Sequence, residues 1–243
     1  MKKIILHFAN SILKVFNIKL IKIVDQFNNS YRLTLGLKDN NIDYLFDIGA
    51  NEGQFINELR YYGFRGKILS FEPLSEAHKK LIINSQRDVN WKVYKRIALG
   101  NKNSKNIINV SQNSVSSSIL EINKRHTESA PNSKIIGKES IEERKFEDIF
   151  FELDIKEKNL FLKIDTQGYE SQVLDGAEKI LNLFKGILVE VSLTELYKNQ
   201  KTWLEIINKI ENLGFEIWSI DRGFTNKNNG RSLQADLVFF RKN

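Results

Sequence analysis

The turn FDIGANEGQF, residues 46 to 55, offers the plainest binding chemistry in this sequence. An apolar run ends there on Asp47, and Gly49 and Gly53 follow with Asn51 between them. Glycine in such a turn permits a positive φ and lets the backbone approach a ligand closely. A dinucleotide site is the obvious alternative, but it requires the register G-x-G-x-x-G, whereas this pattern is D-x-G-x-N-x-G. The turn therefore favours a ligand without a pyrophosphate.

An acid stands at the end of the next apolar run, in Phe71-Glu72-Pro73. It follows the glycines by about twenty residues, the separation at which an acid accepts hydrogen bonds from the hydroxyls of a ribose. Such an acid can also be a simple helix cap. Because it is paired with the glycine turn, we interpret Glu72 as a ribose ligand, and S-adenosylmethionine contains a ribose without a pyrophosphate.

Three residues are candidates for proton transfer: Asp165, Glu190 and His126. Asp165 ends the run LFLKID and Glu190 lies in LVEVS, so both should open onto one edge of a parallel sheet. Asp165 could instead cap a helix or hold the amino group of the cofactor, and Glu190 could pair structurally with Lys163. His126, in the polar segment KRHTES, is either a base carried by a lid or a solvated loop residue.

The elements that must position these groups alternate along the chain. Strand-like runs are DYLFDI, KILSFE, WKVYKRIAL, KNIINVS, LFLKID, GILVEVS, FEIWSIDR and ADLVFFRK. Helix-like periodicity covers 55–62, 75–85, 170–183 and 203–213. This alternation predicts a parallel sheet with helices on both faces, closed by an antiparallel hairpin. Between 101 and 142 the chain is polar, and we expect a loop from about 115 to 138 to cover a site.

In its motifs the chain resembles the FkbM family of S-adenosylmethionine-dependent methyltransferases, over residues 42 to 242. The resemblance rests on FDIGANEG, SFEP, IALG, SVSSS, FEDIF, LVEVS and above all LKIDTQGYESQVLDGAEKIL. It implies a class I methyltransferase (Rossmann-like) fold, with a mostly parallel seven-stranded sheet and an antiparallel strand at the C-terminal end.

The resemblance also implies which residues bind the cofactor. The turn would line the methionine end, Glu72 would bind the ribose, and Ile97 and Ala98 would flank the adenine. The complete implied set is Asp47, Gly49, Ala50, Asn51, Gly53, Phe55, Glu72, Pro73, Ile97 and Ala98.

The sequence lacks features that some classes of methyl acceptor require, and this limits which groups can be methylated. With only Pro73 and Pro131, it has no Asn/Asp-Pro-Pro-aromatic motif for methylation of amino groups, and the absence of cysteine excludes cysteine-based ring-carbon and radical chemistry. The resemblance implies O-methylation of a saccharide or glycoconjugate hydroxyl. Alternatives are a polyketide or lipid hydroxyl, a cofactor-binding module without catalysis, and a nucleic-acid-binding protein. A divalent metal is left open, because two carboxylates without a third ligand do not define a site.

Composition predicts one domain with an N-terminal appendage. With the resemblance, we expect a methyltransferase domain at 42–243, preceded by an amphipathic helical extension at 1–41. Lys3, His7, Asn10, Lys14 and Asn17 form one polar stripe on an otherwise apolar helix. This helix could contact a membrane surface, the domain or a second subunit. The net charge of +7 is partly concentrated there, and the other lysines are spread along the chain. Because the chain also lacks a recognisable nucleic-acid-binding motif, we expect no nucleic-acid partner. A chain without cysteine is compatible with a cytoplasmic location.

Overall fold

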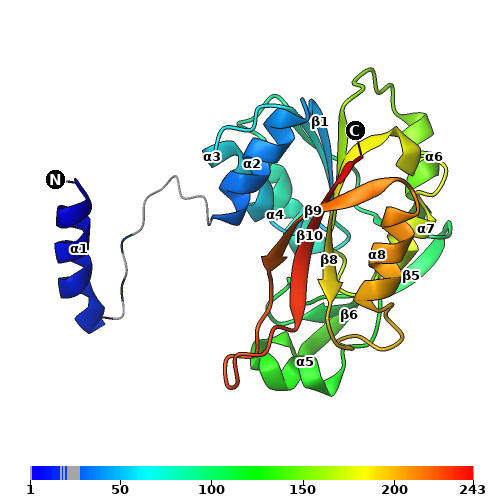
Figure 1. Ribbon diagram of the computed structural model, residues 1–243. Helices are drawn as coiled ribbons and strands as arrows, with labels where there is room; N and C mark the ends of the chain where they lie inside the picture. Colours follow the sequence, from blue (N-terminus) through cyan, green and yellow to red (C-terminus); the bar gives the residue numbers. More distant parts are fainter. Residues whose placement is uncertain (1, 17, 19, 21–27, 243) are drawn as a thin grey trace.

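The computed structural model describes residues 2–16, 18, 20 and 28–242, and its centre is a seven-stranded sheet in the order β3-β2-β1-β7-β8-β10-β9 (Figure 1). Its strands are β1 (Tyr44–Ile48), β2 (Lys67–Phe71), β3 (Trp91–Val93), β7 (Leu160–Ile164), β8 (Phe184–Ser192), β9 (Phe215–Arg222) and β10 (Gln234–Arg241). The pairs from β3 to β8 are parallel, and β10 is antiparallel to both of its neighbours. The predicted class I methyltransferase fold is confirmed.

Helices cover both faces of this sheet (Figure 1). One face carries α2 (Asn29–Asp39), α3 (Gln54–Tyr61) and α4 (Ser75–Ser85), and the other carries α6 (Phe146–Glu152), α7 (Glu170–Asp175) and α8 (Trp203–Glu211). Leu181 of the short helix η3 (Leu181–Leu183) packs in the same core cluster as α6, α7 and α8. Leu37 and Ile56 are fully buried in the first layer, and Phe146 and Ile210 in the second. The inner strands β1 and β7 are buried along their whole length, which explains why all their other residues are apolar or aromatic beside Asp47 and Lys163, which pair with each other.

A second, three-stranded sheet occupies much of the polar region after residue 97. Its order is β4-β6-β5, from β4 (Ala98–Gly100), β5 (Ser104–Ser111) and β6 (Ile135–Lys145), and α5 (Lys124–Ser129) and η2 (Pro131–Ser133) lie between β5 and β6. The single strand expected for WKVYKRIAL is wrong, because the run divides into β3 and β4, which belong to different sheets. β6 was missed because most of its residues are polar and one face is solvent-exposed.

Two helices also differ from expectation. The helix expected for 170–183 ends at Asp175. The next residue, Gly176, lies against the backbone of Gly100, where an added Cβ would be 1.8 Å from the carbonyl oxygen. α2 was not predicted; the side chain of Asn28 caps it by accepting a hydrogen bond from the backbone N–H of Tyr31. α2 lies before residue 42, yet Leu33 and Leu37 pack in the core beside the sheet. The division of the chain at residue 42 stays a prediction.

The helix expected at the start of the chain is present as α1 (Lys2–Leu13), followed by η1 (Lys14–Phe16). Asn17, the last member of its polar stripe, lies outside the described residues. Phe8 and Phe16 are 68% and 69% exposed. None of the described helices has the length and apolarity needed to span a bilayer. Contact with a membrane surface or a second subunit stays a prediction.

Candidate active site

The glycine turn lies between β1 and α3, at the carboxyl end of the sheet. The backbone N–H groups of Gly49 and Ala50 both donate to the carbonyl of Phe71, which fixes the turn on β2. Gly49 has φ +75°, and a Cβ there would lie 1.9 Å from the carbonyl oxygen of Asp165. Only glycine allows this approach of β1 and β7, so the residue serves the packing of the two strands as well as the cleft.

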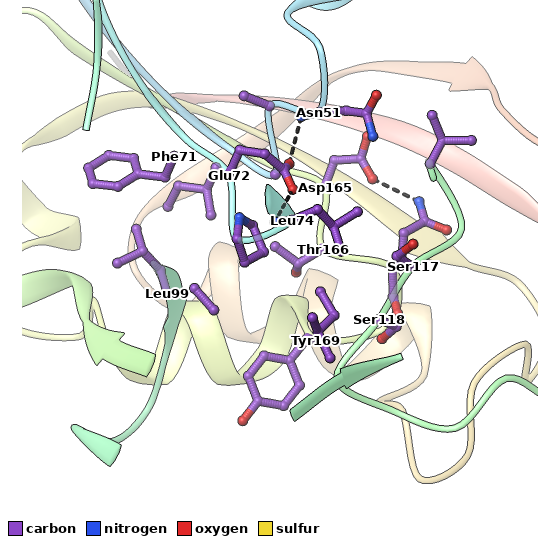
Figure 2. Close-up of a pocket in the computed structure, with 18 of the residues that line it drawn as sticks. Asn51, Phe71, Glu72, Leu74, Leu99, Ser117, Ser118, Asp165, Thr166 and Tyr169 are labelled. Carbon is purple, nitrogen blue, oxygen red and sulfur yellow. Dashed lines mark hydrogen bonds between the residues drawn. The ribbon is translucent and has the colours of Figure 1, made fainter. Parts of the chain in front are cut away.

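Glu72 lies in the same cleft and is almost fully buried (Figure 2). Its Oε2 accepts a hydrogen bond from the backbone N–H of Asn51 at 2.8 Å, and its Oε1 accepts one from Leu74 N–H at 2.8 Å. Each oxygen keeps a further lone pair for a hydroxyl. Burial raises the pKa of this carboxyl to about 7, and the two backbone donors only partly offset that effect.

A pocket extends from the turn past Glu72 to β4 (Figure 2). Of the predicted cofactor residues, it is lined by Gly49, Ala50, Asn51, Phe55, Glu72, Pro73, Ile97 and Ala98. The apolar side chains of Ile97 and Leu99 suit an adenine, and Glu72 lies between them and the glycine turn, as a ribose requires. These residues fit S-adenosylmethionine. Part of the loop that was expected to cover a site lines this pocket, through Val115, Ser117, Ser118 and Ile119.

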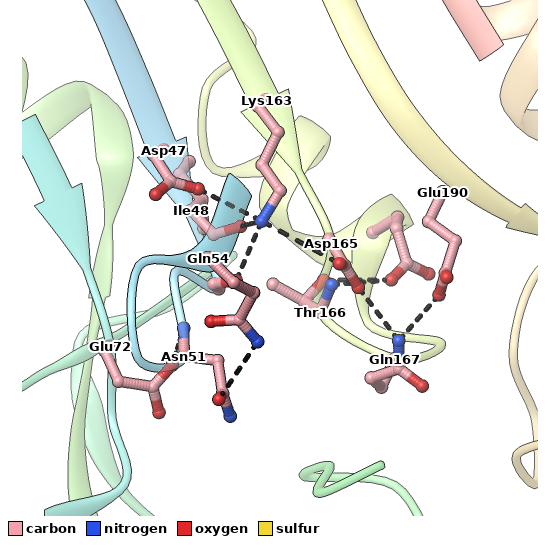
Figure 3. Close-up of polar contacts among 12 residues, drawn as sticks. Asp47, Ile48, Asn51, Gln54, Glu72, Lys163, Asp165, Thr166, Gln167 and Glu190 are labelled. Atoms are coloured by element: carbon pink, nitrogen blue, oxygen red, sulfur yellow. Dashed lines mark hydrogen bonds and ion pairs between the residues drawn. The ribbon is translucent and has the colours of Figure 1, made fainter. Parts of the chain in front are cut away.

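Lys163, on β7, connects the turn to the catalytic candidates (Figure 3). Its ammonium lies 3.0 Å from Oδ1 of Asp47 and 3.8 Å from Oδ2 of Asp165, and it donates to the carbonyl of Gly49 at 2.8 Å. Burial lowers the pKa of the ammonium, but the two carboxylates more than offset this, and the net pKa is raised. The alternative interpretation, in which Glu190 pairs with Lys163, is wrong, because Lys163 pairs with Asp47 and Asp165 instead.

Gln167 joins the two carboxylates that the sequence singled out (Figure 3). Its Nε2 donates to Oδ1 of Asp165 at 2.8 Å and to Oε2 of Glu190 at 2.6 Å, and its Oε1 accepts from the hydroxyl of Tyr197 at 2.7 Å. Gln167 has φ +55°, an uncommon value for a residue other than glycine. Burial and then the charge of Asp165 raise the pKa of Glu190 well above its ordinary value.

The comparison with known families agrees with this geometry. The model of the methyltransferase FkbM domain matches residues 47–217, more than half of the chain. The chain belongs to the FkbM family. It is thus an S-adenosylmethionine-dependent methyltransferase, as the motifs indicated. No curated protein matches the sequence significantly.

Solved structures with a similar fold include three methyltransferases. One is an S-adenosylmethionine-dependent methyltransferase from Clostridium acetobutylicum, 8% identical, with a TM-score of 0.48 and coverage of 98% of both chains. An rRNA methylase from Streptococcus thermophilus is 10% identical, with a TM-score of 0.49 and coverage of 92% of this chain and 100% of that one. The 1,6-didemethyltoxoflavin-N1-methyltransferase from Burkholderia thailandensis is 10% identical, with a TM-score of 0.47 and coverage of 88% and 79%.

Two predicted cofactor residues of this FkbM methyltransferase do not line the pocket. Asp47 is fully buried under the turn, where it accepts a hydrogen bond from Ser70 at 3.0 Å and pairs with Lys163. Gly53 caps α3 with φ +90°, and a Cβ there would lie 2.5 Å from the ring of Trp91. Their positions explain the motif by packing and charge balance.

One interpretation of the sequence placed His126 on a solvated loop, and this interpretation is wrong. The residue lies in α5, 2% exposed, with Nδ1 2.9 Å from the hydroxyl of Ser133 and Nε2 3.3 Å from that of Tyr197. Burial lowers its pKa to about 4, which keeps the ring neutral at physiological pH. It does not line the cofactor pocket, and reaches Gln167 only through Tyr197.

Among the described residues, no three or more histidine, aspartate or glutamate side chains converge in a way that could hold a metal ion.

Glu190, like His126, does not line the cofactor pocket, because it stands behind Gln167, whereas Asp165 lines the pocket directly. Of the three candidates for proton transfer, only Asp165 is thus placed to meet an acceptor beside the cofactor.

Proposed function

We propose that this protein transfers the methyl group of S-adenosylmethionine to a hydroxyl group of a saccharide or glycoconjugate. The observation that carries the proposal is the carboxylate pair of Asp165 and Glu190, held by Gln167 beside the cofactor pocket. Methylation of a hydroxyl requires a proton acceptor, and carboxylates at the carboxyl ends of neighbouring strands are well placed for this role.

S-adenosylmethionine supplies a methyl group already activated by a positively charged sulfur, so the protein has to orient the acceptor and receive its proton. The side chain of Asp165 is 36% exposed and lines the pocket, which makes it the residue that takes the hydroxyl proton. Glu190 stands behind it, and burial and the charge of Asp165 raise its pKa well above the ordinary value, so the pair can hold a proton between them. Gln167 holds the two carboxylates side by side, because its Nε2 donates a hydrogen bond to each of them.

A polyketide or lipid hydroxyl is the second acceptor class, because the same carboxylate pair would serve any hydroxyl. An amino-group acceptor is less favoured, since the chain lacks the proline motif common to such enzymes.

The test is transfer of labelled methyl from S-adenosylmethionine to a panel of saccharides, lipids and RNA. We expect label on a saccharide that survives mild alkaline hydrolysis, because a methyl ether resists alkali whereas a methyl ester releases methanol. Label that is lost in alkali, or that is found on an amine or on RNA, would contradict the proposal. Label on a lipid hydroxyl would support the second acceptor class instead.

A further inference from the structure

A row of acidic side chains continues from the catalytic pair across the sheet. Asp236 on β10 is the direct cross-strand partner of both Glu190 on β8 and Asp221 on β9. Ile164 on β7 pairs with Val189 on the parallel strand β8. The residues that come next on each chain segment, Asp165 and Glu190, therefore lie beside each other. Directly opposed residues of paired strands point to the same face of the sheet. Four carboxylates thus lie in a row on the face covered by α2 and α3.

Cations balance this row only at its ends. Lys163 lies 3.8 Å from Asp165, and Arg32 of α2 lies 2.9 Å from Asp221. Among the described residues, no cation pairs with Glu190 or Asp236 within 4.0 Å. Directly opposed like charges destabilise a sheet, so the row is a cost to the fold. Burial and the charges of Asp165 and Asp221 raise the pKa of Asp236 to about 7.

A cavity of about 440 Å³ lies at the Asp236 and Asp221 end of this row, between the sheet and the first turn of α2. Asp221 and Asp236 line it together with Asn28 and Asn29, and Leu188 and Val238 form an apolar part of its wall. Its size falls within the range of small-molecule sites, which are typically about 300–1,000 Å³. Apolar walls suit the C–H face of a sugar ring, and carboxylate and amide groups suit its hydroxyls.

Phe55 separates this cavity from the cofactor pocket. Its side chain lines both, and the ammonium of Lys163 lies 5.5 Å from the centre of its ring. Phe55 thus stands between the cofactor pocket, which Asp165 lines, and the acid-lined cavity.

We infer that this cavity holds the part of the acceptor beyond the reacting hydroxyl, and that Asp236 and Asp221 restrict it to hydroxyl-rich groups that are uncharged or carry an amine. The inference rests on the proposed O-methylation and adds the charge of the acceptor. A carboxylate or phosphate at this position would meet an unbalanced row of like charges, although the whole chain has a net charge of +7. An anionic saccharide and a nucleic acid are both disfavoured for the same reason.

The experiment is saturation-transfer NMR on the full chain in the presence of S-adenosylhomocysteine, with glucosamine, methyl glucoside and glucuronate as probes of one ring shape and three charges. We expect the strongest binding for glucosamine, weaker binding for methyl glucoside and none for glucuronate. Asp236→Asn should weaken glucosamine binding by about tenfold, the loss expected for a charged hydrogen bond, and bring it level with methyl glucoside. Asp154→Asn, an exposed acid outside the cavity, is the matched control.

Glucuronate binding as strong as that of glucosamine, no binding of any probe, or an unchanged order in Asp236→Asn would overturn the inference. The charge series on the unmodified protein decides the question even if the variant does not fold. Because the measurement is binding of unreacted sugars, its failure leaves methyl transfer to a hydroxyl untouched. Failure of the labelled-methyl screen would instead remove the proposed function and leave the binding order standing.

Discussion

The two sides of the active-site cleft are built in different ways. On the cofactor side, Gly49, Asn51 and Glu72 lie close in sequence, and backbone groups make most of the contacts. On the side where we propose that the acceptor binds, Asp165, Glu190 and Asp236 come from three different strands or strand ends, and their side chains would provide the chemistry. The cofactor side can therefore keep one geometry for one ligand, whereas substitutions on the acceptor side can change the acceptor without altering the turn.

The two sides also differ in how charge is balanced. Asp47, under the turn, is paired at 3.0 Å with Lys163. Glu190 and Asp236 have amide or acidic neighbours instead, and both have raised pKa values. The carboxylate under the turn is thus neutralised by a cation at 3.0 Å, whereas the raised pKa values of Glu190 and Asp236 leave both groups able to take up a proton. The following experiments test this difference.

The largest effect is expected at Gly49. Gly49→Ala places a Cβ 1.9 Å from the carbonyl oxygen of Asp165, so β1 and β7 must move apart and little folded protein should remain. Gly63→Ala is the matched control, because Gly63 also has a positive φ (+101°) but has no atoms within 4 Å of the added Cβ. It should cost only about 1–2 kcal/mol. Equal stability of the two variants in denaturant unfolding would show that the close approach of the strands is unimportant.

Lys163→Met comes next. It leaves Asp47 buried without its cation, and loss of one partner of a buried pair typically costs about 3–5 kcal/mol. The double variant Lys163→Met with Asp47→Asn should recover most of that stability, because no uncompensated charge remains. Urea denaturation of the two single variants and the double variant measures the coupling. Additive effects would mean that the pair does not hold the turn.

Asp165→Asn should reduce turnover by about 10²-fold or more, the usual effect of losing a general base. The melting temperature should change little, because the side chain is 36% exposed. The assay is labelled-methyl transfer to the acceptor found in the saccharide screen, at saturating S-adenosylmethionine, with Asp154→Asn as control. Full turnover under these conditions would assign Asp165 to cofactor binding, and Glu190 would become the stronger candidate.

The smallest effect concerns Glu72 and pH. Its pKa is raised from 4.5 to about 7, and accepting both ribose hydroxyls requires the ionised form. Binding of S-adenosylhomocysteine should therefore weaken as the pH falls below 7, by up to about tenfold per pH unit. Calorimetry on Glu72→Gln should show weaker binding and no such dependence. A pH-dependent Glu72→Gln would place the titrating group elsewhere.

The raised pKa of Glu72 also affects the stability of the ligand-free protein, and here a higher pH is unfavourable. The unfolded chain ionises Glu72 at a lower pH than the folded protein does, so this residue's contribution to stability is complete below pH 4.5 and is lost as the pH rises towards 7.

The sequence by itself determined the parts of this protein that depend on short-range patterns. The parallel strands could be predicted because strands covered on both faces are mostly apolar, as in LFLKI of β7, where Lys163 is the one polar residue. The turn with Gly49 could be predicted because its backbone conformation demands glycine at particular spacings. Asp165 and Glu190 could be named because they end or interrupt such strands.

Only the tertiary structure decided how these pieces work together. Lys163 and Gln167 were not identified as site residues, because a lysine in a strand and a glutamine in a turn carry no signal until Asp47, Asp165 and Glu190 are placed around them. β6 and the environment of His126 depend on contacts between distant segments, which local periodicity does not contain. Asp236 belongs to the acceptor side because β10 inserts antiparallel between β8 and β9, and strand order is set by the packing of whole layers rather than by neighbouring residues.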